Sequence, residues 1–295
     1  MRSRVRPGSG KTASLCAAAL AFCARYAIVA PAVLLPLAGC ENEQPHTVLN
    51  YAENAKRAYE NAMKTFNAHN WIEAQTLMRE VKRKYSYSKY ARLAELRIAD
   101  ADFEQEKYPE ATREYKDFIH AHRGDTEEIE YARSRIAEAT FAEIPESIFL
   151  PASEERDQAA VVDAYKEMKS FIADYPEGKQ TPHVREMLAT ITARLVRHEL
   201  YVARFYLNKS NYDAAVARIQ YALRNYGTAL TGLHGADPTA GLEAEALLLL
   251  GTTYLQMHEW HGARQAFEAI VRNYETSPLA EQARNYLAKM RESGT

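Results

Sequence analysis

The chain has 295 residues, and its 37 basic and 39 acidic residues give a formal net charge of −2. Five basic residues and no acidic ones lie in the first 40 positions, so 32 basic residues face 39 acidic ones in the remainder. This acidic excess argues against nucleic-acid binding, which needs a basic stripe to release counterions. All three cysteines also lie in the first 40 positions, which excludes a disulfide framework in the rest of the chain.

The first 40 residues have the pattern of a secretory signal. A basic start is followed by a run rich in Ala, Leu and Val that closes with Leu37-Ala38-Gly39-Cys40. These four residues resemble the lipobox of bacterial lipoproteins, whose cysteine receives diacylglycerol and an N-acyl chain. We therefore expect Cys40 to become the first residue of the mature chain and to anchor it in the bilayer. The alternative is an uncleaved anchor helix, but Arg25 and Pro31 interrupt the apolar run before the ~18–20 residues that a span needs.

The residue after the cysteine bears on location. Lipoproteins retained in the inner membrane typically carry Asp at this position, whereas this chain has Glu41. The resemblance therefore favours the outer membrane, with the protein facing the periplasm. Residues 41–48 are predicted to form a short polar tether from the lipid.

The rest of the chain is predicted to be all-α, because apolar residues recur with a helical period and no Asn-Gly hairpin turn occurs. A final helix is expected to cover the exposed face of the last of five helix pairs. The expected helices are 49–67 with 70–85, 88–104 with 108–122, 127–142 with 157–175, 183–207 with 211–226, 242–257 with 260–274, and the capping helix 278–291.

The second helix of every pair carries the same stripe, an alanine followed by larger side chains four and eleven positions later. In four pairs another small residue stands twelve positions before the alanine, on the first helix. Small side chains on both helices let the two backbones approach to the short end of the usual ~8–10 Å. This register predicts a superhelical solenoid of the tetratricopeptide (TPR) type. In such a solenoid one helix pair cannot bury its own apolar face, and stacking against the neighbouring pairs buries it. The five alanines are Ala74, Ala111, Ala164, Ala215 and Ala263.

Two insertions lengthen the repeats beyond their minimum. One, 144–156, contains two prolines and the apolar run Ile148-Phe149-Leu150. The other, 227–241, is rich in glycine and is predicted to be a flexible loop. Insertions in a solenoid often lie where partners bind.

Several segments together resemble the BamD family, the lipoprotein subunit of the β-barrel assembly machinery of Gram-negative outer membranes. Besides the lipobox and the five helix pairs, they are KYSYSKYA at 84–91, RDQ at 156–158 and HELYVARFY at 198–206. Ser86 and Gly227 replace junction prolines of the family. The resemblance implies a non-catalytic scaffold whose N-terminal repeats, 49–125, receive unfolded outer-membrane proteins. The C-terminal repeats and cap, 126–295, would dock a barrel-forming subunit with POTRA domains, alongside other assembly lipoproteins.

Two groups of site residues follow from this resemblance. Arg218 matches a basic position of the family at the POTRA contact, although a solvated surface arginine is the alternative. Tyrosines could line a groove for an extended apolar peptide, since tyrosine gives contact area at little entropic cost. Ordinary packing between repeats is the alternative for them. The tyrosines are Tyr85, Tyr87, Tyr90 and Tyr108.

No pattern in the sequence predicts catalysis, a metal site or a cofactor beyond the acyl chains on Cys40. His258-Glu259-Trp260-His261 lacks the spacing that places two zinc ligands one helical turn apart. His120 and His122 point away from each other on a helix. The alternative function is a periplasmic TPR lipoprotein that coordinates envelope integrity or cell-wall enzymes.

Overall fold

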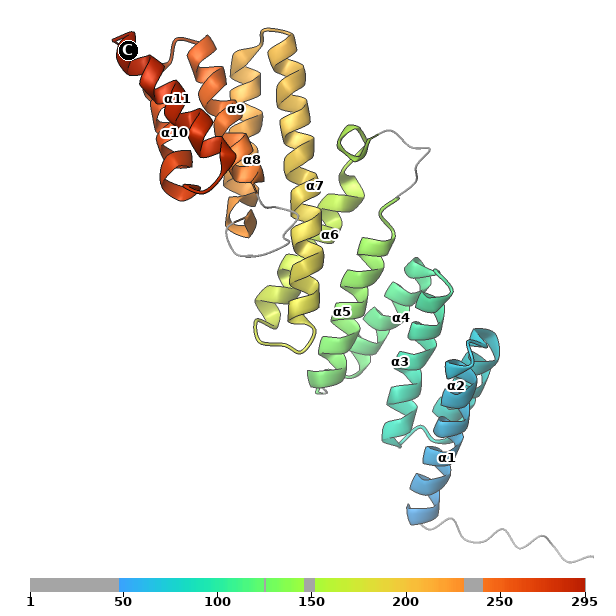
Figure 1. Ribbon diagram of the computed structural model, residues 1–295. Helices are drawn as coiled ribbons and strands as arrows, with labels where there is room; N and C mark the ends of the chain where they lie inside the picture. Colours follow the sequence, from blue (N-terminus) through green and yellow to red (C-terminus); the bar gives the residue numbers. More distant parts are fainter. Residues whose placement is uncertain (1–47, 125, 146–151, 231–240, 295) are drawn as a thin grey trace, which may run out of the picture. The chain divides into compact units, whose positions relative to one another are not determined.

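The computed structural model describes residues 48–124, 126–145, 152–230 and 241–294. The leader with Cys40 and residues 41–47 of the predicted tether therefore lie outside the described residues, whereas Val48 already belongs to the first helix. Ile148-Phe149-Leu150 and most of the predicted loop 227–241 also lie outside them. Residues 46–295 form one compact unit. The described part of that unit consists of helices and their connections, without a strand (Figure 1).

Eleven α-helices and one short 3-10 helix account for the regular structure in the described ranges. Consecutive helices pack as neighbours along the chain, so the order of contacts is that of stacked pairs. The helices are α1 (Val48–Asn67), α2 (Trp71–Lys84), α3 (Lys89–Glu104), α4 (Tyr108–Ala121), α5 (Thr126–Ala142), η1 (Ser153–Glu155), α6 (Ala159–Asp174), α7 (Thr181–Asn208), α8 (Tyr212–Leu230), α9 (Leu242–Gln256), α10 (Trp260–Asn273) and α11 (Pro278–Glu292).

These helices confirm the predicted all-α fold of five pairs and a cap, since α11 packs against α9 and α10. One boundary was wrong. We expected a loop from residue 227, but α8 continues to Leu230. The residues after Tyr226 are Gly227, Thr228, Ala229 and Leu230. Alanine and leucine favour helix strongly enough to extend it past one glycine, which costs about 1 kcal/mol relative to alanine.

The stripe positions on the second helices face the core. All five repeat alanines are fully buried. The large residues four positions later are fully buried as well, namely Met78, Tyr115, Met168, Ile219 and Phe267. The small partners Ala62, Ala99, Ala203 and Gly251 are buried on the first helices. A Cβ built on Gly251 would lie 2.5 Å from the Phe267 ring, so that approach requires glycine.

Four of the five pairs make the turn between their helices in the same way. A non-glycine residue with a positive φ of 55–61° follows the first helix, and the N–H of the next residue bonds to the carbonyl five positions back. This is the Schellman arrangement, which satisfies the last carbonyls of the helix. The aromatic residue that begins the second helix stands two positions later. The left-handed residues are His69, Glu106, Ser210 and His258.

The longest helix, α7, belongs to two pairs at once. Its 28 residues contact α5, α6 and η1 as well as α8 and α9. One hydrophobic cluster accordingly runs through these helices, from Ala137 on α5 to Ala266 on α10. The N-terminal pairs have smaller clusters of their own, and so does the C-terminal pair with its cap.

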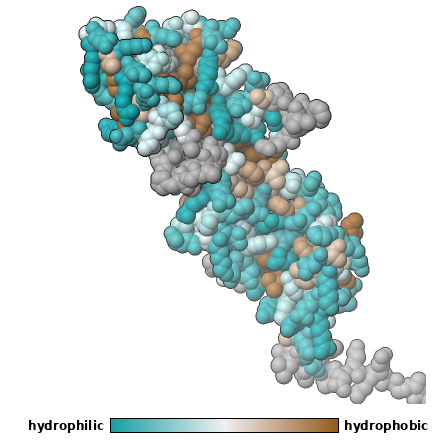
Figure 2. All heavy atoms as spheres, viewed as in Figure 1, coloured by the Kyte–Doolittle hydropathy of each residue, from teal (hydrophilic) through white to brown (hydrophobic). Residues whose placement is uncertain are grey.

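The viewed face of the described chain is mostly hydrophilic, with apolar atoms visible in limited patches near its middle and over the C-terminal helices (Figure 2). None of the helices that the structure describes is both long enough and apolar enough to cross a bilayer.

Candidate functional site

Four places in the described chain combine charged or aromatic side chains in ways that packing alone does not require. They are the tyrosines between α2 and α3, a buried ionic cluster between α3, α4 and α5, a charged groove between α2, α3 and α4, and the surface around Arg218.

The predicted group of four tyrosines is not one group. Tyr85 stacks edge-on against Tyr51, with ring centroids 5.4 Å apart, and Tyr90 lies 5.6 Å from Tyr59. Tyr87 is 97% exposed, and its backbone N–H donates to the Tyr51 hydroxyl at 3.4 Å. These contacts gather the tyrosines of the α2–α3 junction on α1.

Tyr108 lies elsewhere, so the structure does not bring it together with the other three tyrosines. It packs against Phe103 at the far end of α3, with ring centroids 5.2 Å apart. Thirteen residues of helix separate Tyr90 from Phe103, about 20 Å at 1.5 Å per residue. Tyr51 and Tyr59 of α1, which sequence reasoning did not include, are the tyrosines that pack against Tyr85 and Tyr90.

A buried carboxylate joins the second pair to the third. Asp100 on α3 is only 2% exposed and accepts hydrogen bonds from the hydroxyls of Tyr115 on α4 and Tyr131 on α5, the latter at 2.9 Å. Arg97 donates to Oδ2 of Asp100, and Arg135 Nε lies 3.8 Å from Oδ1, the oxygen that the two tyrosines share. A buried charge is tolerated only when it is paired and hydrogen-bonded, as Asp100 is.

The same cluster shifts the titration of its members. Burial, and then the Asp100 carboxylate, raise the pKa of Tyr131 to about 12. Burial and Asp100 likewise raise the pKa of Tyr115 well above its usual range. Both hydroxyls therefore stay protonated as donors at physiological pH. The Arg135 guanidinium also lies 3.7 Å from the Phe103 ring, which links the cluster to the aromatic pair with Tyr108.

A charged groove lies next to this cluster, between α2, α3 and α4. Glu95 contacts Lys82 at 2.8 Å and His122 at 2.6 Å. Burial raises the Glu95 pKa, but hydrogen bonds from Lys82 and His122 outweigh it, so the pKa is lowered overall. On the other wall, burial and then the Asp102 charge raise the pKa of Glu114.

Arg218 lies on α8, where it is exposed to solvent and also has a charged partner on α7. Its side chain is 45% exposed, and its guanidinium donates to Glu199 Oε2 on α7 at 3.3 Å. Glu199 itself is buried. Three residues along α8, Tyr221 is 43% exposed and contacts Tyr226, whose ring meets Tyr165 of α6 edge-on at 5.4 Å.

The pKa of Tyr226 is raised, first by burial and then by the neighbouring Tyr221 and Glu199. Arginine and tyrosine are the residue types that most often dominate protein–protein interfaces. Arg218 and Tyr221 lie about one turn apart on the exposed side of α8, and the tyrosine contacts of this helix run from Tyr221 to Tyr226.

The histidines weighed as metal ligands have other partners. His122 binds Glu95, His120 lies 3.4 Å from Arg123, and His261 lies 2.9 Å from Gln265. His258 is a left-handed turn residue that packs against Trp260. Across the described ranges, no group of three or more His, Cys, Asp and Glu side chains is arranged to hold a metal ion.

Comparison with known proteins points to one family. The family model described as YfiO, outer membrane lipoprotein, matches residues 51–232, a stretch that runs from α1 to just past the end of α8. An outer membrane protein assembly factor BamD from Caulobacter vibrioides is 27% identical over 234 residues, covering 76% of this chain and 74% of that protein.

Two further relatives bear the same name. The one from Neisseria meningitidis serogroup A is 22% identical over 233 residues, covering 78% of this chain and 83% of the relative. The one from Xylella fastidiosa is 19% identical over 228 residues, covering 77% and 74%. Since the family model covers more than half of its residues, this chain belongs to the YfiO family of outer membrane lipoproteins.

Proposed function

We propose that this chain is a non-catalytic scaffold of the complex that assembles β-barrel proteins in the outer membrane. Its membership of an outer membrane lipoprotein family supports the location, and relatives named as outer membrane protein assembly factors support the role. Acyl chains on Cys40 hold it to the periplasmic face of that membrane, and no other cofactor is involved.

The Arg218 surface carries the docking part of the proposal. An exposed arginine beside exposed Tyr221, fixed from below by the buried Glu199, presents a pre-organised contact for a partner. We assign it to the POTRA-bearing barrel subunit. Residues 126–295, the C-terminal pairs and the cap, form the partner-docking part of the chain. Other assembly lipoproteins complete the complex.

Unfolded outer-membrane proteins are assigned to the N-terminal pairs, residues 49–125. Support comes from the α2–α3 junction, where the Tyr87 side chain is almost fully exposed and its backbone N–H bonds to Tyr51, which packs against Tyr85. An exposed aromatic on a rigid tyrosine base suits an extended apolar peptide. Tyr108 is not part of this surface, since it lies at the other end of α3.

Charge reversal at Arg218 tests the docking. The full-length chain is purified from outer membranes in mild detergent, as Arg218→Glu and as Arg224→Glu, an exposed control on the same helix. We expect Arg218→Glu to lower co-purification of the POTRA-bearing protein at least tenfold, with Arg224→Glu unchanged. Equal yields from both variants would refute the assignment of Arg218. Recovery of a cell-wall enzyme without any barrel protein would favour the alternative function.

Lipidation has its own test. Mass spectrometry of the mature N-terminus is expected to find an acylated Cys40, and Cys40→Ala to leave the chain outside the membrane fraction. An unmodified Cys40, or a leader that is not cleaved, would show that the anchor is something other than the acyl chains.

A further inference from the structure

The place where α2 ends and α3 begins is strongly basic. Residues 79–92 contain six basic residues and one acidic residue, whereas the chain after residue 40 has more acidic residues than basic ones. The last turn of α2 carries Lys82, Arg83 and Lys84. Lys89 is the first residue of α3. We call Arg83, Lys84 and Lys89 the basic junction, and all three residues are exposed.

Carboxylates of this chain neutralise only part of the basic junction. Lys84 contacts Glu80 at 3.3 Å, but both side chains are about half exposed, and such pairs are weak. In the part of the chain that the structure describes, no carboxylate forms an ion pair with Arg83 or Lys89. The Lys89 Nζ lies 5.3 Å from the centre of the Tyr90 ring. Two full positive charges therefore remain at this surface.

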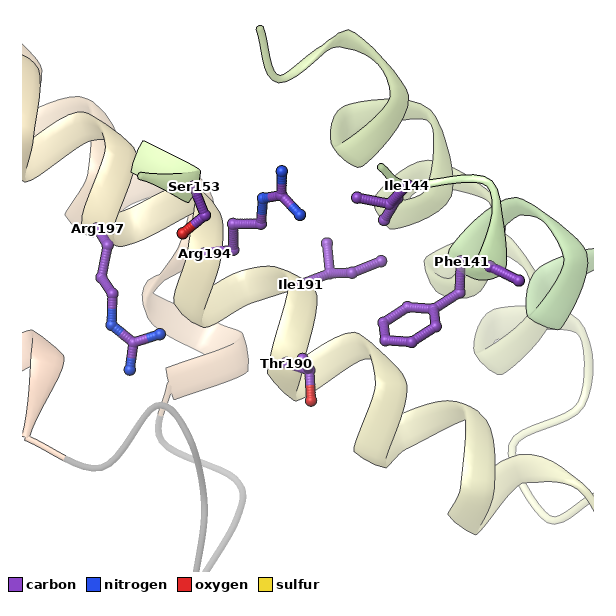
Figure 3. Close-up of a pocket in the computed structure, with 8 residues that line it drawn as sticks. Phe141, Ile144, Ser153, Thr190, Ile191, Arg194 and Arg197 are labelled. Carbon is purple, nitrogen blue, oxygen red and sulfur yellow. The ribbon is translucent and has the colours of Figure 1, made fainter. Parts of the chain in front are cut away.

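A pocket of about 440 Å³ between α5, η1 and α7 shows the contrast. Arg194 and Arg197 line it, and Ser153 of η1 lies close to Arg194 (Figure 3). Both arginines already interact within the chain, and η1 carries Glu154 and Glu155. The positive charge at that pocket is compensated from within, whereas the charge of the basic junction is largely uncompensated.

Helix stability does not account for the basic junction. Arg83 and Lys84 stand at the negative end of the α2 dipole, which favours basic residues. Lys89 stands at the positive end of the α3 dipole, where acidic residues are favoured instead. The first turns of α1 and α3 nevertheless contain no acidic residue. The positive charge at this end therefore exceeds what the helices need.

The basic junction lies beside the start of α1. The backbone N–H of Tyr87, between Lys84 and Lys89 in the chain, donates to the Tyr51 hydroxyl at 3.4 Å. Tyr51 stands less than one turn after Val48, the first residue of α1. Residues 41–47 connect Val48 to the cysteine of the lipobox, and seven residues span at most about 25 Å. An acyl anchor on that cysteine therefore keeps the start of α1 close to the bilayer.

We propose that the basic junction binds the anionic phospholipid headgroups of the leaflet that holds the acyl chains. Arg83 and Lys89 meet phosphates with charges that no carboxylate of the described chain takes up, and Lys84 adds a third charge. The short tether raises the local concentration of headgroups, so that a few charges suffice. Tyr87 lies among these residues, and tyrosine is enriched where membrane and water meet.

This inference deepens the proposed function and rests on it for the acyl anchor at Cys40. With the basic junction on the headgroups, the exposed Tyr87 stands at the membrane surface. An unfolded outer-membrane protein is then received next to the bilayer in which its barrel forms.

Photo-cross-linking to lipid tests the proposal in vesicles. The mature chain, residues 40–295, includes the whole compact unit and a single thiol, Cys40, which is coupled to a maleimide lipid so that every variant has the same anchor. Benzoylphenylalanine replaces Ser86 or, as the control, Asn67 at the other end of α1, and both positions are exposed. The vesicles contain phosphatidylethanolamine with either anionic phosphatidylglycerol or neutral phosphatidylcholine. We expect Ser86 to give about tenfold more lipid adducts with phosphatidylglycerol, and Asn67 few with either, as counted by mass spectrometry.

Charge reversal then shows whether the basic junction is responsible. Arg83→Glu together with Lys89→Glu should lower the adduct yield from Ser86 about tenfold in the anionic vesicles. Lys64→Glu together with Lys107→Glu makes the same change of charge near the opposite ends of α1 and α3. This control should leave the yield within about twofold, because charges beyond a Debye length are screened. Circular dichroism checks that both variants keep their helices.

Equal adduct yields from Ser86 in the two kinds of vesicle would overturn the proposal. An equal yield from Asn67, or a yield that the double reversal at Arg83 and Lys89 leaves unchanged, would overturn it as well. Because the anchor is attached chemically, these outcomes do not depend on acylation of Cys40. Mass spectrometry of the mature N-terminus tests that acylation by itself, so the headgroup site and the natural anchor fail separately.

Discussion

The Tyr131 hydroxyl of α5 donates a 2.9 Å hydrogen bond to Asp100 of α3, across the boundary between the second and third helix pairs. Tyr115 of α4 bonds to the same carboxylate oxygen, so one buried charge is shared by three helices. Neighbouring pairs are therefore fastened by a polar cluster as well as by apolar stacking.

Removing that carboxylate should be costly. Asp100→Ala leaves the largely buried Arg97 and Arg135 without their shared partner, so we expect a loss of about 3–5 kcal/mol in unfolding free energy. Glu104→Ala is the control, because Glu104 contacts Arg135 at 3.4 Å but is 44% exposed. It should cost under about 1 kcal/mol. Urea unfolding followed by circular dichroism compares the two, and equal midpoints would contradict a structural role for Asp100.

Gly251 should tolerate no larger side chain. A Cβ there would stand 2.5 Å from Phe267, whose ring is fixed by stacking on Tyr286 at 4.9 Å. Gly251→Ala is expected to lower stability by about 1–3 kcal/mol, as overpacked cores do. Gly227→Ala is the matched control, since nothing lies within 4 Å of a Cβ at that helical position. Thermal unfolding should rank Gly251→Ala lowest, the parent chain next and Gly227→Ala highest.

The left-handed turn residues offer stabilising substitutions. Ser210 has a φ of 55°, a conformation that costs an L-residue roughly 1–2 kcal/mol and glycine much less. After the entropy that glycine loses on folding, Ser210→Gly should raise stability by about 0.5–1 kcal/mol. Ser210→Val, which is branched at Cβ, should lower it. A melting temperature that falls with glycine would mean that the serine makes a contact worth more than its strain.

Two glutamates of one groove should respond to pH in opposite senses. The Glu95 pKa is lowered in the folded chain, so its contribution is present above the unfolded pKa of about 4.5 and is lost as the pH falls below that value. Glu95→Gln should therefore be destabilising near pH 7 and nearly neutral in acid.

The pKa of Glu114 is raised, by burial and by Asp102, so stability falls as the pH rises from the unfolded pKa of about 4.5 toward the folded pKa, and the full penalty is present above the latter. Glu114→Gln should consequently stabilise the chain near pH 7, with the gain fading toward acid. Denaturant unfolding at several pH values measures both variants. Parallel pH profiles for the two would contradict the assigned environments.

The fold was predictable because its signals are local. Ala215 and Ile219 lie four residues apart on one helix, and the partner Ala203 lies only twelve residues before Ala215, so helical periodicity places all three. The same stripe on Ala263 and Phe267 explains why Gly251 is small.

What could not be predicted depends on how successive pairs stack. Asp100 meets Tyr115 and Tyr131, which are 15 and 31 residues away, and no periodicity marks those positions as partners. Tyr108 lies apart from the other three tyrosines for a related reason, because residues close in sequence can lie at opposite ends of α3.

Because α7 contributes to the packing of both the third and the fourth helix pair, these pairs should not unfold independently of each other. A helix-breaking residue at its centre, such as proline at Ala193, would melt α5 to α9 together while α1 and α2 kept their own cluster. Pulling from either end should accordingly extend the chain in a few large steps, with the span from α5 to α9, which carries Arg218, unfolding as one.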